Sequence, residues 1–173
     1  MSDPASHGLV VWLTGLPSSG KSTLARRAQQ ALVAAGRATI LLDGDDVRAC
    51  LVPTPGYGEV DRSDFYESLA RLAALLARQG YVVLVPATAH RALFRQRARL
   101  LAPRFAEVLV EVSAAECAAR DPRGLWARAR AGEVSRLPGQ GVTYERPETP
   151  AVIAQGGLDD AALAAVVALA DAA

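Results

Sequence analysis

The stretch LVVWLTGLPSSGKST, residues 9–23, decides the fold. Its first part, Leu9–Thr14, is almost wholly apolar, as expected of a β-strand buried on both faces. The second part has Gly15, four further residues and then Gly20-Lys21-Ser22, which is the spacing G-x-x-x-x-G-K-[ST]. A helix is expected directly afterwards, over residues 21–35. A strand, a glycine-rich turn and a helix in this order predict a phosphate-binding loop.

The chemistry of this loop follows from its residue types. Glycines let the backbone turn so that successive N–H groups point at phosphate oxygens, and the following helix adds unpaired N–H groups and a partial positive charge. We expect Lys21 to contact the terminal phosphates of a nucleotide and the Ser22 hydroxyl to ligate Mg²⁺. Pro17 removes one N–H group, a loss that the remaining donors tolerate. The residues predicted to hold the phosphates are Gly15, Ser18, Ser19, Gly20, Lys21, Ser22 and Thr23.

Outside the loop, apolar runs alternate with segments of helical apolar spacing. Further strands are expected over residues 38–42, 81–86 and 107–112, and further helices over 63–79, 91–101, 114–120 and 158–172. Gly36 and Gly80 stand where helices are expected to end. This alternation predicts an α/β fold of the P-loop NTPase type, a parallel sheet with helices on both faces, forming one domain over residues 1–173. Two stretches rich in Gly and Pro, 52–61 and 123–150, are expected to be loops.

The bulk composition argues against several kinds of partner. Nineteen basic and 18 acidic residues give a formal charge of +1, so no overall field favours nucleic acid or an anionic membrane. No apolar run approaches the roughly 20 residues that span a bilayer, and the start MSDPASHG lacks the pattern of a signal peptide. Cys50 and Cys117 are not spaced like metal ligands. We therefore expect a cytoplasmic protein whose partner is a small molecule.

Carboxylates follow the second expected strand, in LLDGDDVR, residues 41–48. Open α/β sheets bind ligands at the carboxyl ends of their strands, so Asp43 is placed to accept a hydroxyl proton or to hold Mg²⁺. For Asp45 and Asp46, capping of a short following helix is the competing interpretation. The third strand ends without an acidic residue, so the Walker-B motif of motor ATPases and GTPases is missing. Phosphoryl transfer to a hydroxyl is therefore favoured over nucleotide hydrolysis.

These segments together resemble the adenylylsulfate kinases, which transfer the γ-phosphate of ATP to the 3′-hydroxyl of adenosine 5′-phosphosulfate (APS). The resemblance is carried by GLPSSGKST, LLDGDDVR, GYGEVDR, AHR and ARDPRGLWARARAGE followed by YERPE, and it covers most of residues 9–153. It implies a kinase that uses ATP and Mg²⁺, with Lys21 and Asp43 catalytic and with Ser22 and Asp43 holding the metal. A homodimer is a further implication.

The resemblance also assigns an acceptor pocket and a lid. Arg48 and Arg62 are expected to grip the phosphosulfate group, because guanidinium forks suit its oxygens, and Tyr57 is expected to stack on the adenine. Residues 121–150 are expected to form a mobile lid over ATP. The arginines that concentrate positive charge there are Arg120, Arg123, Arg128 and Arg130, of which Arg120 and Arg123 are assigned to the nucleotide. The acceptor pocket is completed by Asp45, Phe65, Thr88 and Leu137.

Three segments of this pocket depart from the family pattern. R-x-x-N-x-R appears as Arg62 to Glu67 with Phe65 in place of the Asn, and F-I-S-P-Y-R appears as PATAHR, residues 86–91. The Phe of G-F-T-G-I-D, one of two aromatic covers of the adenine, is replaced by Leu137. The glutamate at 67 is expected to repel an anionic acceptor. Phe65 is either a replacement ring or, with Tyr66, part of the apolar face of its helix, and His90 is either an acceptor contact or a packing residue.

The departures leave the acceptor open. APS is the first candidate, and a ribose hydroxyl of another nucleotide derivative, such as a cytidine diphosphate conjugate from a capsule-sugar pathway, is the second. A non-catalytic ATP-binding module would keep Lys21 and Ser22 but has no need of Asp43, Arg48 and Arg62 together. Their joint presence favours catalysis.

Overall fold

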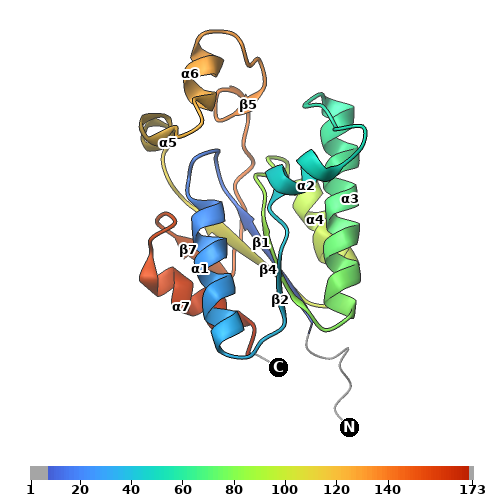
Figure 1. Ribbon diagram of the computed structural model, residues 1–173. Coiled ribbons are helices and arrows are strands. Elements are labelled where there is room, and N and C mark those ends of the chain that lie inside the picture. The colour runs from blue at the N-terminus through green and yellow to red at the C-terminus, as the bar shows by residue number, and fades with distance from the viewer. Residues whose placement is uncertain (1–7, 172–173) are drawn as a thin grey trace.

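The computed structural model describes residues 8–171. Its centre is a parallel sheet in the order β2-β3-β1-β4-β7 (Figure 1). The strands are β1 (Leu9–Thr14), β2 (Thr39–Leu41), β3 (Val82–Pro86), β4 (Phe105–Val110) and β7 (Val152–Ala154). The helices are α1 (Lys21–Ala34), α2 (Gly44–Cys50), α3 (Glu59–Arg78), α4 (Ala92–Leu101), α5 (Ala114–Arg120), α6 (Leu125–Arg130) and α7 (Asp160–Leu169). The predicted fold class is confirmed.

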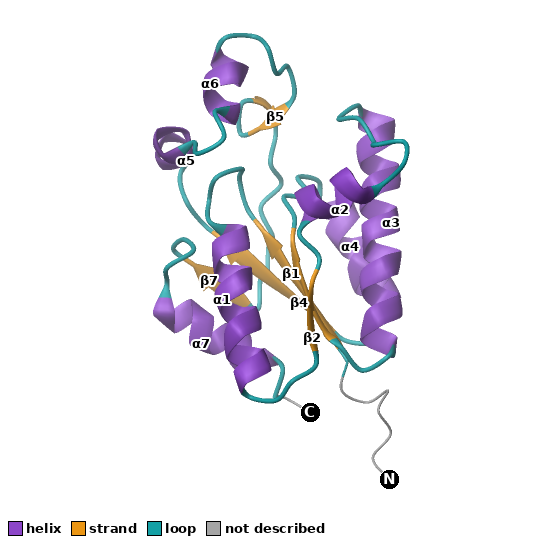
Figure 2. Ribbon diagram, in the orientation of Figure 1, coloured by secondary structure: helices purple, strands orange, loops and turns teal. Residues whose placement is uncertain are grey.

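Helices cover both faces of the sheet, and β1 packs against both layers (Figure 2). Leu9, Val11 and Leu13 pack in the core formed with α1 and α7. Val10 and Trp12 pack in the core formed with α3 and α4. Side chains of a strand alternate between faces, so a central strand covered on both sides has to be apolar throughout. This requirement explains the apolar run of β1. Because the glycine-rich turn follows β1 directly, it lies at the carboxyl edge of the sheet.

Several predicted boundaries are wrong, and those of α3 and β4 differ most clearly. Helix α3 begins at Glu59, four residues before the expected start at Ser63, so the loop predicted over 52–61 is shorter than expected. Glu59 and Asp61 lie in its first turn, where carboxylates stabilise a helix by opposing its dipole. Strand β4 spans 105–110 rather than 107–112, because Phe105 already pairs with Val10 of β1.

The predicted loop 123–150 contains structure that the sequence did not reveal. Helix α6 lies within it, as do the two short paired strands β5 (Leu137–Pro138) and β6 (Gly141–Val142). Strand β7, on the edge of the main sheet, was also missed. The C-terminal helix spans 160–169 instead of 158–172, and the last of those predicted positions, residue 172, lies outside the described residues. We use "lid segment" below for residues 121–150.

Within residues 8–171, no helix combines the length and the apolar character that crossing a bilayer requires.

Candidate active site

The turn between β1 and α1 has a backbone that only glycine accommodates at its two ends. Gly15 has a φ of 151° and Gly20 a φ of 102°. A Cβ atom at Gly15 would come within 2.4 Å of the Val110 carbonyl oxygen, and one at Gly20 within 2.5 Å of the Gly157 nitrogen. The Ser19 side chain is buried inside the turn, where its Oγ has no hydrogen-bond partner among the described residues. The turn therefore forms a cradle whose outer side is packed against the backbone of Val110 and Gly157.

Lys21, the first residue of α1, folds back over this cradle. Its Nζ donates to the carbonyl oxygens of Gly15 at 2.9 Å and Leu16 at 2.8 Å. Burial lowers the pKa of Lys21 to about 8, an effect that the nearby carboxylates of Asp45 and Asp43 partly oppose. The ammonium group thus lies at the loop and can exchange carbonyl partners for phosphate oxygens.

Ser22 and Asp43 meet at the mouth of the cradle. The Ser22 Oγ donates to the Asp43 Oδ2 at 2.5 Å, and the Asp43 Oδ1 accepts from the Asp45 N–H at 3.1 Å. Asp43 itself is therefore the N-cap of α2, whereas Asp45 and Asp46 lie in the first turn, which corrects the capping interpretation made for them. Parallel strands end at the same edge, so the order β2-β3-β1 brings a residue after β2 close to a residue after β1.

A cavity of about 990 Å³ extends from the cradle to α3, and we call it the main cavity. The predicted site residues that line it are Ser18, Gly20, Lys21, Ser22, Asp43, Asp45, Arg48, Tyr57, Phe65, Thr88, Arg123 and Leu137. The structure thus brings together the two halves that the sequence predicted separately. Ser135 and Arg136 of the lid segment and Arg26 of α1 also line it, and no motif in the sequence marks them. Glu133, which lines it too, ends the motif ARDPRGLWARARAGE but was not predicted as a site residue.

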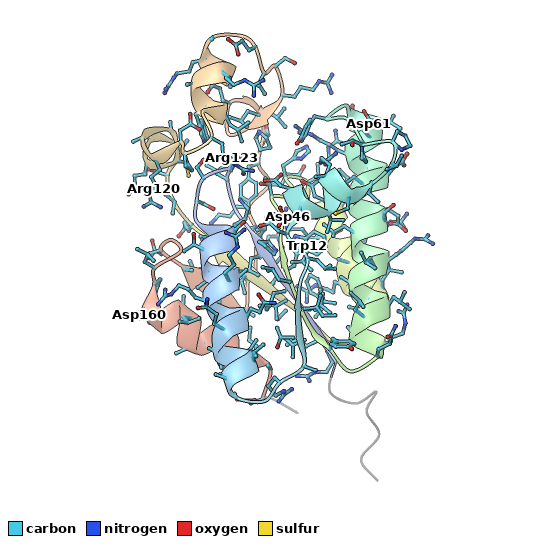
Figure 3. The ribbon with its side chains drawn as sticks, in the orientation of Figure 1. Trp12, Asp46, Asp61, Arg120, Arg123 and Asp160 are labelled. Atoms are coloured by element: carbon cyan, nitrogen blue, oxygen red, sulfur yellow. The ribbon has the colours of Figure 1, made fainter. Side chains whose placement is uncertain are left out.

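Five predicted residues lie elsewhere. Gly15 and Ser19 form the floor of the cradle, and Thr23 is exposed on α1. Arg120, assigned to the nucleotide, is exposed at the end of α5 and is not among the residues lining the main cavity (Figure 3). Arg62 is buried and lines a second cavity, described below.

Arg48 and Phe65 form one unit. The Arg48 guanidinium lies 3.8 Å from the centre of the Phe65 ring and 4.5 Å from that of the Tyr57 ring. Its Nη1 donates to the carbonyl oxygens of Pro55 and Gly56, at 3.2 and 2.7 Å. Phe65 is 3% exposed and packs in the core with Tyr66. Phe65 therefore belongs to the apolar face of α3, as one interpretation held, and the ring face that it turns to Arg48 supports that buried cation.

Glu67 does not face the acceptor pocket. Its carboxylate pairs with Arg71 on the same helix at 2.8 Å and with Arg97 of α4 at 3.5 Å, and it does not line the main cavity. The expected repulsion of an anionic acceptor by this residue is wrong. Glu67 follows Arg62 by five residues on α3 and therefore lies on a different face of the helix.

Several contacts between described residues join the lid segment to the rest of the molecule, and three of them lie beside the main cavity. The Trp126 Nε1 donates to the Pro17 carbonyl at 3.1 Å, Arg123 pairs with Asp45, and the Arg62 Nη2 donates to the Arg136 carbonyl. Figure 3 shows Arg123 on the side of the lid segment that is nearest to the carboxyl edge of the sheet. Leu137 is buried in a small apolar cluster with Trp126, while also lining the main cavity.

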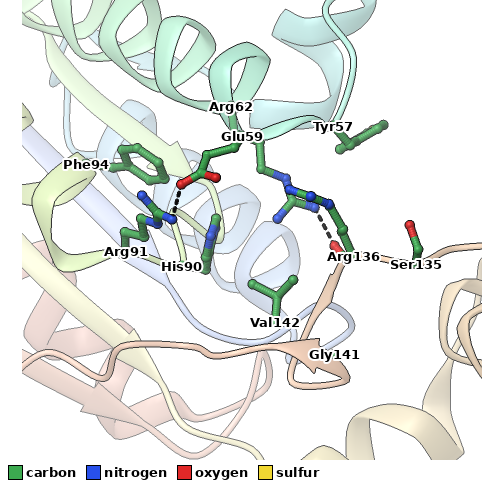
Figure 4. A pocket seen from close by; sticks show the side chains of 10 residues that line it. All are labelled: Tyr57, Glu59, Arg62, His90, Arg91, Phe94, Ser135, Arg136, Gly141 and Val142. Carbon is green, nitrogen blue, oxygen red and sulfur yellow. Dashed lines mark hydrogen bonds and ion pairs between the residues drawn. The ribbon is translucent and has the colours of Figure 1, made fainter.

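The second cavity, of about 320 Å³, is smaller and lies beside α3 (Figure 4). Its lining residues are Tyr57, Glu59, Arg62, His90, Arg91, Phe94, Ser135, Arg136, Gly141 and Val142. Tyr57, Ser135 and Arg136 line the main cavity as well, so the two cavities adjoin at these residues. We call it the side cavity.

The donor set at the mouth of the cradle suits Mg²⁺. Among the described residues, no group of three or more His, Cys, Asp or Glu side chains could hold a metal ion. Mg²⁺ is commonly held by one or two protein oxygens, with phosphates and water completing the shell. A hydroxyl and a carboxylate 2.5 Å apart beside a phosphate cradle fit that requirement.

Comparison with known proteins agrees with this geometry. The family model described as "Adenylylsulphate kinase" matches residues 7–155. The adenylyl-sulfate kinase of Yersinia pestis is 43% identical over 152 residues, covering 87% of this chain and 71% of the relative. That of Enterobacter sp. (strain 638) is 41% identical over 154 residues, covering 87% and 76%. The structure of the Mycobacterium tuberculosis APS kinase in complex with AMPPNP and APS has a TM-score of 0.88 at 34% identity, covering 96% of this chain and 99% of that one. The chain belongs to the adenylylsulfate kinase family, whose members are ATP-dependent kinases.

Proposed function

We propose that the protein transfers the γ-phosphate of ATP to the 3′-hydroxyl of APS. The observation that carries the proposal is the Ser22–Asp43 contact at 2.5 Å, because it joins the phosphate cradle to the acceptor half of a single cavity. Membership of the adenylylsulfate kinase family supports the choice of acceptor.

The nucleotide half of the site holds the phosphates of ATP. Backbone N–H groups of the cradle and the first turn of α1 contact their oxygens, and Lys21 contacts the terminal phosphates. Ser22 and Asp43 would hold Mg²⁺, which would supply positive charge to offset that of the nucleotide phosphates. Arg123 and Arg128 line the cavity and add positive charge where the transferred group becomes more negative.

The acceptor half positions the 3′-hydroxyl beside Asp43. As the oxygen bonds to the γ-phosphorus, the bond from that phosphorus to the bridging β-γ oxygen breaks, ADP leaves, and Asp43 accepts the hydroxyl proton. Arg48 and Arg62 hold the phosphosulfate, and Tyr57, 59% exposed, offers a ring face to the adenine. The lid segment excludes water, which competes with the acceptor for the phosphoryl group.

The loss of an aromatic cover at Leu137 keeps a second acceptor class in the test. Leu137 packs on Trp126 inside the lid segment. The adenine of APS would therefore have one aromatic neighbour, Tyr57, rather than two. Nucleotides with smaller bases, such as cytidine diphosphate conjugates, make less use of a second ring.

The experiment is turnover with MgATP and a panel of acceptors, comprising APS, AMP, ADP and cytidine diphosphate conjugates, with ADP release measured and the product identified. Rapid formation of the 3′-phosphorylated APS supports the proposal. Turnover of another acceptor without turnover of APS overturns the acceptor assignment, and ATP binding without any transfer favours a non-catalytic module. The expected homodimer stays a prediction, which light scattering during gel filtration tests.

A further inference from the structure

The side cavity lies where the far end of an acceptor would reach. It adjoins the main cavity at Tyr57, Ser135 and Arg136. The guanidinium groups of Arg48, in the main cavity, and Arg62, in the side cavity, both lie over the Tyr57 ring, at 4.5 and 5.9 Å from its centre. An acceptor with its hydroxyl at Asp43 therefore extends past Tyr57 into the side cavity.

The charges around the side cavity favour an anion. Three arginines line it, and its one carboxylate, that of Glu59, is paired with Arg91. Burial and the neighbouring guanidinium groups of Arg48 and Arg136 lower the pKa of Arg62. Cations that destabilise one another in a half-enclosed space are stabilised when an anion enters it.

His90 completes the wall of this cavity (Figure 4). The side chain is 6% exposed, and its Nδ1 has no hydrogen-bond partner among the described residues. A buried polar atom without a partner is rare in folded proteins and calls for a ligand or another explanation. Burial, reinforced by the positive charges of Arg62, Arg91 and Arg95 and opposed by Glu145, lowers the pKa of His90 to about 4. The imidazole is therefore neutral at physiological pH and can donate a hydrogen bond without adding a charge to the arginines.

The backbone on both sides of His90 is fixed. The preceding residue, Ala89, has a φ of 39°, an uncommon value for a residue with a side chain. Its N–H donates to the Tyr66 hydroxyl at 3.1 Å, and its carbonyl accepts from Arg95 Nη1 at 2.5 Å. The His90 carbonyl accepts from the Glu145 N–H at 2.8 Å. Groups that recognise a ligand are commonly preorganised by such supporting contacts.

We propose that His90 determines acceptor specificity by donating a hydrogen bond from Nδ1 to the distal anionic group of the acceptor, the sulfate of APS, in the side cavity. The inference rests on the proposed function and narrows its substrate class to nucleotides whose 5′ substituent carries a second anionic group beyond the first phosphate. Sulfate oxygens only accept hydrogen bonds, so Nδ1 carries the imidazole proton in the complex.

The test compares His90→Leu, which removes the donor, with His90→Asn, whose amide nitrogen lies near the position of Nδ1. Gln96→Leu, an exposed polar-to-apolar change on α4, is the matched control. At saturating MgATP, His90→Leu is expected to raise the KM for APS by about tenfold or more, because a charged group loses its hydrogen bond in a partly desolvated site. The kcat and the KM for ATP stay close to those of the wild type, and His90→Asn recovers most of the lost affinity.

A second measurement separates recognition of the distal group from a general change of the pocket. Calorimetry with the AMPPNP-loaded protein gives the affinity for APS and for AMP, which lacks the sulfate. The proposal expects His90→Leu to weaken APS binding and to leave AMP binding unchanged. Equal weakening of both, or unchanged APS binding, overturns the role of His90 while leaving an active kinase. Failure of the wild type to use or bind APS instead overturns the proposed function, and this inference with it.

Discussion

At the scale of single residues, Asp43 combines two tasks. Its Oδ1 caps α2 and its Oδ2 accepts from Ser22, and the side chain is only 7% exposed. A cap holds its side chain in one orientation, so the second oxygen is fixed toward the cavity before any ligand binds. The helix thereby orients the carboxylate proposed to accept a proton.

Replacing Asp43 with Asn keeps a side-chain oxygen for the cap and removes the charge. We expect kcat to fall by about 10²–10⁴, the usual contribution of a positioned acid or base, while AMPPNP still binds. Single-turnover kinetics and calorimetry measure the two effects. Asp64→Asn, an exposed change on α3 that lines neither cavity, is the control and keeps normal kcat. An unchanged rate in Asp43→Asn would remove this residue from the catalytic role.

Lys21 gives a prediction about pH. Because the pKa of its ammonium is lowered to about 8 in the nucleotide-free protein, much of it is neutral above pH 8. Phosphates favour the charged form and raise that pKa, so nucleotide binding near pH 8.5 takes up a proton, and affinity falls as the pH rises through 8. Calorimetry of AMPPNP binding in buffers of different ionisation enthalpy measures the uptake. Lys21→Ala is expected to show neither proton uptake nor turnover, and the absence of buffer dependence in the wild type would contradict the assignment.

The site residues that the sequence predicted best are those whose chemistry is local. The Gly15 to Thr23 turn needs its glycines and its lysine at fixed spacing, so the spacing identifies it. Glu67 was misjudged because a motif gives a position but not the helix face that carries it. The environment of His90 depends on Tyr66, Arg95 and Glu145, which lie far along the chain, and no local pattern records such contacts.

At the scale of elements, α4 carries a buried arginine that ties several segments together. Arg95 is 2% exposed, and its Nε donates to Glu107 of β4 at 2.5 Å. Its other nitrogens donate to the carbonyls of Ala89, after β3, and Glu145, near the C-terminal end of the lid segment. The Arg95 guanidinium thus connects three parts of the molecule: strand β4, the segment after β3 and the segment that leads into β7.

Arg95→Met is expected to lower the free energy of unfolding by about 3–5 kcal/mol, because it leaves the Glu107 carboxylate without its buried partner. Urea denaturation measures the change. Arg97→Met, on the exposed face of the same helix, is the control and should cost no more than about 1 kcal/mol. Similar losses in both variants would mean that the buried pair contributes no more than a surface one.

Most elements were predicted within a few residues, whereas α6 and β7 were missed. The bounds of β1 match the prediction, and α1 ends one residue earlier than predicted. Helix α6 has six residues and β7 three, too few for an apolar period to appear. The first turn of α3 was hidden because Gly56 and Gly58 give its approach the composition of a loop.

At the scale of the whole molecule, the lid segment packs in a small third core, which it shares with α5 and the residues after β4. Val112, Cys117, Trp126 and Leu137 cluster apart from the two cores on the faces of the sheet. A unit with few buried contacts opens at a lower free energy than the main body. The contacts with Pro17, Asp45 and Arg62 therefore help to set how often the lid segment leaves the cradle, together with those of Glu145 near its C-terminal end.

Two tryptophans provide a matched test of whether the lid segment opens separately from the main body. Trp126 and Trp12 each donate from Nε1 to one carbonyl, that of Pro17 at 3.1 Å and that of Ala87 at 3.2 Å. Changing either to Phe removes a hydrogen bond worth about 1 kcal/mol. Trp126→Phe should speed hydrogen exchange within residues 123–145 and raise the KM for ATP, with little change in global unfolding. Trp12→Phe should lower global stability, and indistinguishable exchange patterns would argue against a separately opening lid.

The direction of the sheet also separates the first and last described residues from the cavities. Gly8, the first described residue, lies against Ala77 near the end of α3, and Asp171, the last, is paired with Arg37 beyond α1. Both lie at the pole of the molecule opposite the lid segment (Figure 1). Anchoring the protein to a bead or an electrode near either of these residues would leave its open face toward the solution, a convenient orientation for an immobilised catalyst.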